Sequence, residues 1–169
     1  MGLPRRLKNF MLFNEGMAYK GEVPEIKLPA LKRKMEDYRS GDMAGPVKSD
    51  MGVDGMTLEW TSAGFLPDVL GQFGAPRHDA VYLRFAGSLQ ADDTDEVNAV
   101  EVVMRGRHSE IDFGTAKGGE KTEIKVKTEL SYYQLSMDGI VLVEIDMVNN
   151  IETVNGIDIS IDIRSTSRR

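Results

Sequence analysis

The amino-acid sequence predicts a mainly β fold: an antiparallel β-sandwich or barrel with one short flanking α-helix. Three features of the chain support this prediction. Apolar and polar residues alternate over several segments, two Asx-Gly pairs join such segments, and a single segment has helical spacing. Strict alternation is typical of antiparallel strands with one buried face. The 169 residues suffice for one domain with a substantial core, so we expect a single domain over residues 1–169.

The clearest alternation lies in residues 56–61, 81–90 and 157–164. In each segment the apolar side chains fall on one face and the polar side chains on the other, which predicts a half-buried strand. The apolar members are Met56, Leu58, Trp60, Val81, Leu83, Phe85, Leu89, Ile157, Ile159, Ile161 and Ile163.

A longer segment, residues 121–137, changes the phase of its alternation. Apolar or β-favouring residues occupy even positions up to Tyr132 and odd positions from Tyr133 onward. Because a shift of one residue moves every side chain to the other face of a sheet, we expect a β-bulge or a sharp coil at Tyr132-Tyr133. One long strand would then serve two packed layers. The alternative is two separate strands with an ordinary break between them.

Turn signals divide the last third of the chain. Asp138-Gly139 and Asn155-Gly156 both favour the positive φ angles of a two-residue hairpin turn. The segment that returns from the first turn, residues 141–147, again alternates apolar with polar residues. The sequence therefore predicts two hairpins that follow the long strand.

One segment has helical spacing. Leu66, Val69, Leu70 and Phe73 form an apolar stripe with steps of three and four residues, which predicts a short helix over 66–73 packed on a sheet. The flanking residues agree, because a proline suits the first turn, a glycine suits the C-terminal cap and a second proline prevents continuation.

Composition excludes several function classes. The chain has no cysteine, which rules out disulfides, iron–sulfur clusters and cysteine-based zinc sites. It has no apolar run of about 18 residues, so we expect no membrane span or anchor. A net charge of −6 argues against a nucleic-acid-binding protein. Residues 1–40 carry +4 and residues 41–169 carry −10, which fits either head-to-tail association or an ordinary uneven surface.

The chain offers no evident constellation for catalysis or cofactor binding. His78 and His108 have no partner at metal-ligand spacing. No serine lies in a Gly-x-Ser-x-Gly elbow, and the glycines of residues 113–121 do not match a phosphate-binding loop. The acidic residues of segment 92–96 lack the glycine and distal glutamate of a calcium loop. We therefore expect a protein that is not an enzyme and that uses no cofactor or metal.

Three ordered segments, residues 7–16, 28–52 and 131–149, carry a family resemblance. The second, LPALKRKMEDYRSGDMAGPVKSDMG, is the most specific, and the third is SYYQLSMDGIVLVEIDMVN. Together they resemble the major tail tube protein family of contractile-tailed bacteriophages, which also serves phage-tail-like bacteriocins. The C-terminal sequence IDISIDIRSTSRR departs from the family pattern because it is more strand-like.

This resemblance implies a β-sandwich or barrel of the tail tube type, with six copies in a ring and rings stacked into a tube inside a contractile sheath. The implied function is structural: the tube conducts the genome from the capsid into the host cell. The implied partners are further copies of the chain, the tail sheath protein, and the tape-measure, baseplate and tail terminator proteins, while DNA passes through without specific binding. The implied location is the virion tail, assembled in the cytoplasm of the bacterial host.

Two sets of residues are candidates for assembly within such a tube. Segment 40–56 is interpreted as a long loop that reaches the next ring, since a methionine-rich loop is seldom left in solvent; the alternative is a loop folded over its own sheet. The polar side of a long hairpin is expected to face the lumen. The inter-ring or inter-subunit candidates are Met43, Pro46, Val47, Met51 and Met56. The lumen candidates are either Glu101, near the strand 97–105, or Glu123, Lys125, Lys127 and Glu129 on the charged side of 121–129.

Two other interpretations stay open. A tube subunit of a related contractile injection or secretion system, or of a bacteriocin, would share the architecture and differ in carrying protein cargo or in puncturing a target membrane. A monomeric ligand-binding β-barrel would need a closed apolar pocket within one copy of the chain.

Overall fold

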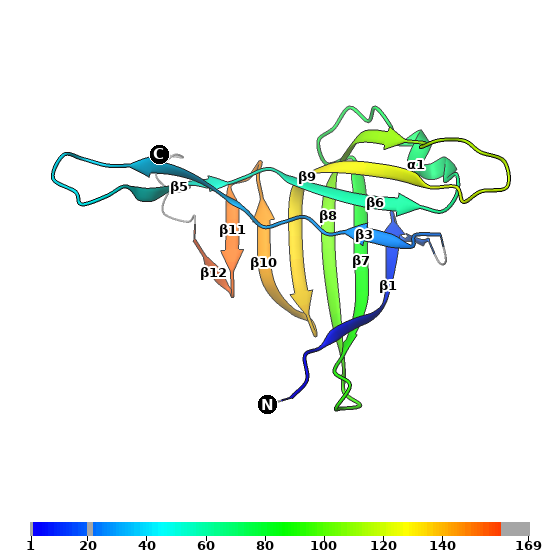
Figure 1. Ribbon diagram of the computed structural model, residues 1–169, viewed down its shortest axis with the longest axis horizontal. Helices are drawn as coiled ribbons and strands as arrows, with labels where there is room; N and C mark the ends of the chain where they lie inside the picture. Colours follow the sequence, from blue (N-terminus) through cyan, green and yellow to red (C-terminus); the bar gives the residue numbers. More distant parts are fainter. Residues whose placement is uncertain (1, 20–21, 160–169) are drawn as a thin grey trace.

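The computed structural model describes residues 2–19 and 22–159, and strands dominate this part of the chain (Figure 1). The helix found within it is α1 (Pro67–Gly71). The strands are β1 (Arg6–Asn14), β2 (Met17–Ala18), β3 (Glu25–Lys27), β4 (Arg33–Tyr38), β5 (Val47–Val53), β6 (Met56–Ser62), β7 (Val81–Gln90), β8 (Val97–Asp112), β9 (Ile124–Met137), β10 (Ile140–Asp146), β11 (Ile151–Val154) and β12 (Ile157–Asp158). Ile161 and Ile163 lie outside the described residues, so β12 alone represents the strand expected over 157–164.

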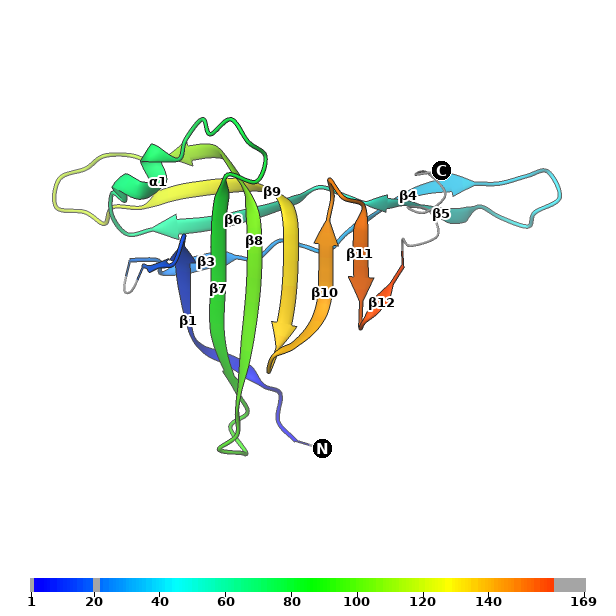
Figure 2. The ribbon, with the colours of Figure 1, turned by 180° about the vertical axis from the view of Figure 1, so that it is seen from behind.

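Ten of the strands form one antiparallel sheet that folds into two packed layers (Figures 1 and 2). Layer A contains β1, β2, β7, β10, β11 and β12, with the first half of β8 and the second half of β9. Layer B contains β3 and β6, with the first half of β9 and the second half of β8. The strands of the two layers cross at a steep angle in both views, as in an orthogonal sandwich. The predicted antiparallel sandwich with one short helix is confirmed.

The layers are joined because β8 and β9 bend and continue from one into the other. At the bend Arg105 pairs with Tyr132 but Gly106 pairs with Leu130, so Ser131 is an extra residue in β9. The buried positions of β9 change from even to odd across this bulge. The expected phase change in a single strand is therefore confirmed, but it lies at Ser131. Tyr132 therefore faces away from the core, and the predicted position of the bulge, Tyr132-Tyr133, is wrong by one residue.

The hydrophobic core lies between the two layers. Alternation places one face of the central strands in it, and β6 and residues 81–87 of β7 are buried at every second residue, as predicted. Trp60 and Tyr19 stack within the core with ring centroids 6.2 Å apart. The fully or nearly fully buried side chains are Leu12, Tyr19, Met56, Leu58, Trp60, Val69, Val81, Leu83, Phe85, Val102, Met104, Ile124, Val126, Leu130, Tyr133 and Ile145.

Both predicted hairpin turns are present. Asp138 and Gly139 have φ angles of 52° and 82°, and Asn155 and Gly156 have φ angles of 53° and 80°. Two successive positive φ angles are the geometry that matches the twist of the flanking strands. These turns order β9, β10, β11 and β12 side by side in layer A.

The helix is shorter than the predicted range. It begins after Leu66 and ends at Gly71, and Val69 is its buried residue. Leu70 is half-buried, and Phe73, the last member of the predicted stripe, has 61% of its surface exposed. Only part of the predicted apolar stripe is therefore buried within one copy of the chain.

Strands β4 and β5 form a separate two-stranded sheet, here called the arm, which projects from the sandwich (Figures 1 and 2). The expectation of a loop over residues 40–56 is wrong in part. The connection between the strands is limited to residues 39–46, Val47–Val53 is β5, and Met56 is the first residue of β6. Pairing of β5 with β4, interrupted by a register shift opposite Met51 and Gly52, allows this segment to extend away from the body as a strand.

Candidate assembly surfaces

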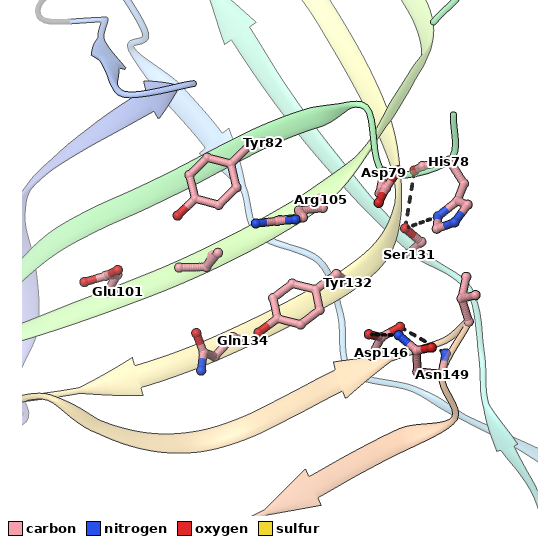
Figure 3. A pocket seen from close by; sticks show the side chains of 12 residues that line it. His78, Asp79, Tyr82, Glu101, Arg105, Ser131, Tyr132, Gln134, Asp146 and Asn149 are labelled. Carbon is pink, nitrogen blue, oxygen red and sulfur yellow. Dashed lines mark hydrogen bonds between the residues drawn. The ribbon is translucent and has the colours of Figure 1, made fainter. Parts of the chain in front are cut away.

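The face of layer A that points away from the core is open and polar. It holds a shallow cavity of about 690 Å³ over β7, β8, β9 and β10 (Figure 3). Register places Tyr82, Arg105, Tyr132 and Asp146 in one row across these four strands. The residues that line the cavity are His78, Asp79, Tyr82, Glu101, Val103, Arg105, Ser131, Tyr132, Gln134, Asp146, Val148 and Asn149.

Arg84 and Arg105, two cations of this open face, are engaged by groups of the same face. Arg84 Nε lies 3.0 Å from Glu101 Oε1, and Gln134 Nε2 donates to Glu144 Oε2 at 3.1 Å. The Arg105 guanidinium lies over the Tyr82 ring, 5.2 Å from its centroid. Cations that are paired or stacked in this way are poor ligands for a row of phosphates, because binding would require them to leave their partners.

The five lumen candidates do not lie on one surface. Glu101 lies on the open face of layer A, as described above. Lys125, Lys127 and Glu129 are exposed on the outer face of layer B, and Glu123 immediately precedes β9 beside them. Since the core separates the two layers, the two sets point away from each other. Only one of the two alternatives can therefore line the inside of a tube.

The second set takes part in a local charge network. Lys127 Nζ lies 3.6 Å from Glu110 Oε2 and 3.9 Å from Glu59 Oε1. Glu129 accepts a hydrogen bond from Thr57 Oγ1 at 2.8 Å. Such exposed cross-strand pairs contribute modestly to the stability of a sheet.

Four of the five inter-ring candidates lie in the arm. Val47 and Met51 each have 55% of their surface exposed, and Pro46 is exposed at the tip. Met43 is half-buried, and its sulfur accepts a hydrogen bond from the Ser40 amide at 3.2 Å. The fifth candidate, Met56, is placed wrongly: it is 1% exposed and belongs to the core.

Layer A has two outer edges. Its strand order runs from β12 at one end to β1 and β2 at the other. Strand β2 pairs only with the last two residues of β1, Phe13 and Asn14. Within the described residues, no strand pairs with Arg6–Met11 on the side away from β7. This unpaired edge can accept a strand from another chain.

A buried polar network was missed by sequence reasoning. His108 Nδ1 lies 2.9 Å from Thr128 Oγ1, and its Nε2 lies 3.1 Å from Gln72 Oε1. Gln72 also exchanges hydrogen bonds with Asn14, which donates to the Tyr19 hydroxyl at 2.9 Å. Burial lowers the pKa of His108 to about 4, so the imidazole is neutral at pH 7. The network ties the end of α1 to β1, β8 and β9.

A metal site or a membrane span is not found in the described chain. Over residues 2–19 and 22–159, no three His, Cys, Asp or Glu side chains group as ligands for a metal ion. The same part of the chain has no helix that is long and apolar enough to cross a membrane. His78 contacts Ser131, with 2.9 Å between Nδ1 and Oγ, at the rim of the open face.

Comparison with known proteins decides the family. The family model described as phage tail tube protein FII matches residues 4–166. The chain belongs to the phage tail tube protein family. The tail tube protein of Escherichia phage P2 is 48% identical over 161 residues, which cover 94% of each chain. The major tail tube protein of Serratia phage KSP20 is 36% identical over 158 residues, covering 92% of this tail tube protein and 91% of the relative.

Solved structures share the fold of this tail tube protein at low sequence identity. One is the sheath-tube complex of PVC, an extracellular contractile injection system, with a TM-score of 0.57, 10% identity, and coverage of 79% of this chain and 90% of that chain. Another is the tube terminating cap of the anti-feeding prophage, with a TM-score of 0.57, 11% identity, and coverage of 81% and 92%. The predicted family and the structural, non-enzymatic role are both confirmed by the relatives.

Proposed function

We propose that this tail tube protein forms six-membered rings that stack into a tube inside a contractile sheath, and that the phage genome passes through the tube into the host cell. The observation that carries the proposal is the wide layer A, which over residues 2–19 and 22–159 has an unpaired edge on β1 and a short edge strand, β12, at its other end. Joining such edges between copies closes a sheet into a barrel and removes exposed edges. The ring number of six rests on the family resemblance.

The open face of layer A is proposed as the wall of the lumen. A continuous wall requires neighbouring subunits to place their strands side by side around the ring. Layer A supplies six adjacent strands for this, in the order β11, β10, β9, β8, β7 and β1. Glu101 then lines the lumen, whereas Glu123, Lys125, Lys127 and Glu129 face away from it. The engaged cations and the excess of acids on the open face suit a conduit, because free cations would bind DNA phosphates with release of counterions and slow the passage of the DNA.

The arm is proposed to contact another ring through Met43, Pro46, Val47 and Met51. A two-stranded hairpin is only marginally stable when isolated in water, so packing on a neighbouring subunit would stabilise the exposed arm. Contacts of this head-to-tail kind repeat without closing along the tube axis and produce an open filament. Variants Met43→Asp and Met51→Asp are expected to remain folded and to lose polymerisation, and normal tubes would contradict this role.

The further partners are proposed from the resemblance and from related assemblies. The solved neighbours come from a sheath-tube complex, a tube terminating cap and a baseplate. We place a sheath protein around this tube, terminator and baseplate proteins at its ends, and a tape-measure protein within it during assembly. The tube would be built in the bacterial cytoplasm and remain in the virion.

Electron microscopy of the purified chain tests the proposal. At high protein concentration we expect rings or tubes with a hollow centre, and six-fold symmetry in end-on averages. A chain that stays monomeric at all concentrations, with or without a tail baseplate as nucleus, would overturn it. If particles isolated from the native source carry protein rather than DNA through the tube, the chain would instead be the tube subunit of an injection system.

A further inference from the structure

The arm joins the sandwich through a narrow base. Within residues 2–19 and 22–159, β4 and β5 pair with each other and with no other strand. At the base the Asp54 amide donates to the carbonyl oxygen of Lys32 at 2.9 Å, and Val53 packs against the edge of the core. One apolar contact at the base fixes where the arm begins but leaves its direction free to change. A fixed direction requires a second point of attachment.

Arg33 supplies such an attachment. It lies opposite Val53 at the base of the arm. Its Nε donates to Asp50 Oδ2 within the arm, and its Nη1 donates to Glu152 Oε2 of β11 at 2.8 Å. A planar guanidinium that binds two carboxylates holds all three groups in a fixed arrangement, here called the clamp. Both views show the arm projecting on the side of the sandwich where β11 and β12 lie (Figures 1 and 2).

Glu152 is an acid on the inner face of layer A. It lies directly opposite Ile145 in the pairing of β11 with β10, so the two side chains point to the same face of the sheet. Ile145 is 7% exposed and belongs to the core, and the side chain of Glu152 is 14% exposed. A carboxylate in this position loses much of its hydration and is stabilised by a cation that binds it. The Arg33 guanidinium is such a cation, and the arm brings it there.

We infer that Arg33 is a positioning residue that sets the direction of the arm by holding Asp50 against Glu152 of β11. Strand β11 lies beside β12, at one outer edge of layer A. The clamp therefore connects the arm to the edge at which, in the proposed tube, subunits join within a ring. Because Arg33 and Asp50 are partly exposed to solvent, the clamp is weak. Its loss is expected to reduce the population of the observed arm direction about two- to fivefold.

Pulsed electron paramagnetic resonance on the unassembled subunit tests the clamp, because the chain has no cysteine of its own. Spin labels are attached at Ala44→Cys, in the exposed connection of the arm, and at Asp95→Cys, in the exposed loop between β7 and β8. The otherwise unmodified chain is expected to give one narrow distribution of distances. Arg33→Met and Glu152→Gln should each broaden it. The double variant should be no broader than either single variant, since both changes remove the same contact.

The matched control is Lys48→Met. Lys48 Nζ lies 2.6 Å from Asp37 Oδ1, so this change removes an ion pair that lies wholly within the arm. The distance distribution of this variant should stay narrow. A narrow distribution in Arg33→Met and Glu152→Gln, or equal broadening in Lys48→Met, would overturn the role of the clamp. All of these variants are expected to keep the circular dichroism spectrum of the unmodified chain.

A role of the clamp in stacking rests on the proposed function and is measured separately. In light scattering, tubes of Arg33→Met are expected to elongate about two- to fivefold more slowly than tubes of the unmodified chain. Elongation at the full rate in a variant with a broad distance distribution would overturn the role in stacking. Failure of the unmodified chain to form any ring or tube would overturn the proposed function and would leave the distances within the free subunit unaffected.

Discussion

Gly106 of β8 lies directly against the backbone of Glu129 in β9, at the bend where both strands pass from one layer to the other. A Cβ atom added at Gly106 would overlap the carbonyl oxygen of Glu129 and would stand 2.9 Å from its carbonyl carbon. The bulge at Ser131 brings the two backbones this close. The orthogonal sandwich therefore depends on the absence of a side chain at one position of β8.

The variant Gly106→Ala is expected to be strongly destabilised, since the atoms it meets are backbone and cannot move aside. A loss of more than about 2 kcal/mol in the free energy of unfolding follows from overpacking at a rigid site. Urea denaturation followed by circular dichroism measures it. Gly71→Ala is the matched control, because an added Cβ there meets no atom within 4 Å; its effect should stay within about 1 kcal/mol. Equal stability of the two variants would contradict the account of the bend.

Acid is expected to destabilise the fold through His108. The pKa of this buried imidazole is about 4, because burial lowers it from its ordinary value of 6.5. Above pH 6.5 the imidazole is neutral in the folded and unfolded states, so its ionisation has no effect there. As the pH falls from 6.5 to 4, the unfolded chain binds the proton first, and stability decreases by up to about 3 kcal/mol.

The comparison that isolates this effect is the variant His108→Gln. Its free energy of unfolding should be lower than that of the unmodified chain at pH 7, because the contacts to Gln72 and Thr128 are altered. Between pH 6.5 and 4 the difference between the two proteins should narrow, since only the unmodified chain carries the histidine penalty. Parallel pH profiles would show that His108 does not titrate in the way its burial requires.

Met56 and Met51 should respond in opposite ways to truncation, although they are five residues apart. Met56 is 1% exposed and Met51 is 55% exposed. Met56→Ala leaves a cavity in the core and is expected to cost about 2–5 kcal/mol. Met51→Ala should change the stability of the isolated chain by less than about 0.5 kcal/mol and should weaken polymerisation. Thermal denaturation and light scattering distinguish the two effects, and a stable Met56→Ala protein would contradict its core position.

Thiol labelling should reveal which outer face lines the tube. We prepare Glu101→Cys for layer A and Glu129→Cys for layer B in a chain that has no other cysteine. In the free subunit both thiols should react with a bulky polyethylene glycol maleimide. In assembled tubes Glu101→Cys is expected to be protected from the bulky reagent and to react with a small maleimide, whereas Glu129→Cys should react with both. The reverse pattern would place layer B inside.

Much of the local structure follows from the chain alone. The alternation of residues 81–90 predicted β7, and Asp138-Gly139 and Asn155-Gly156 predicted two turns that are present with positive φ angles. These features depend on neighbouring residues in the sequence, so local patterns suffice to predict them. The same patterns placed Phe73 in a core stripe, although it is exposed, because a stripe does not reveal whether its partner belongs to the same copy of the chain.

By itself the sequence determined the strand-rich fold class, the hairpin turns, the change of phase in β9 and the family resemblance, since each depends on patterns among residues that are close together in the chain. Only the tertiary structure decided that the bulge is at Ser131, that Met56 is buried, and that Glu101 and Glu129 lie on opposite faces. These properties depend on the pairing register between strands far apart in the chain, and a shift of one residue in that register reverses which side every residue faces.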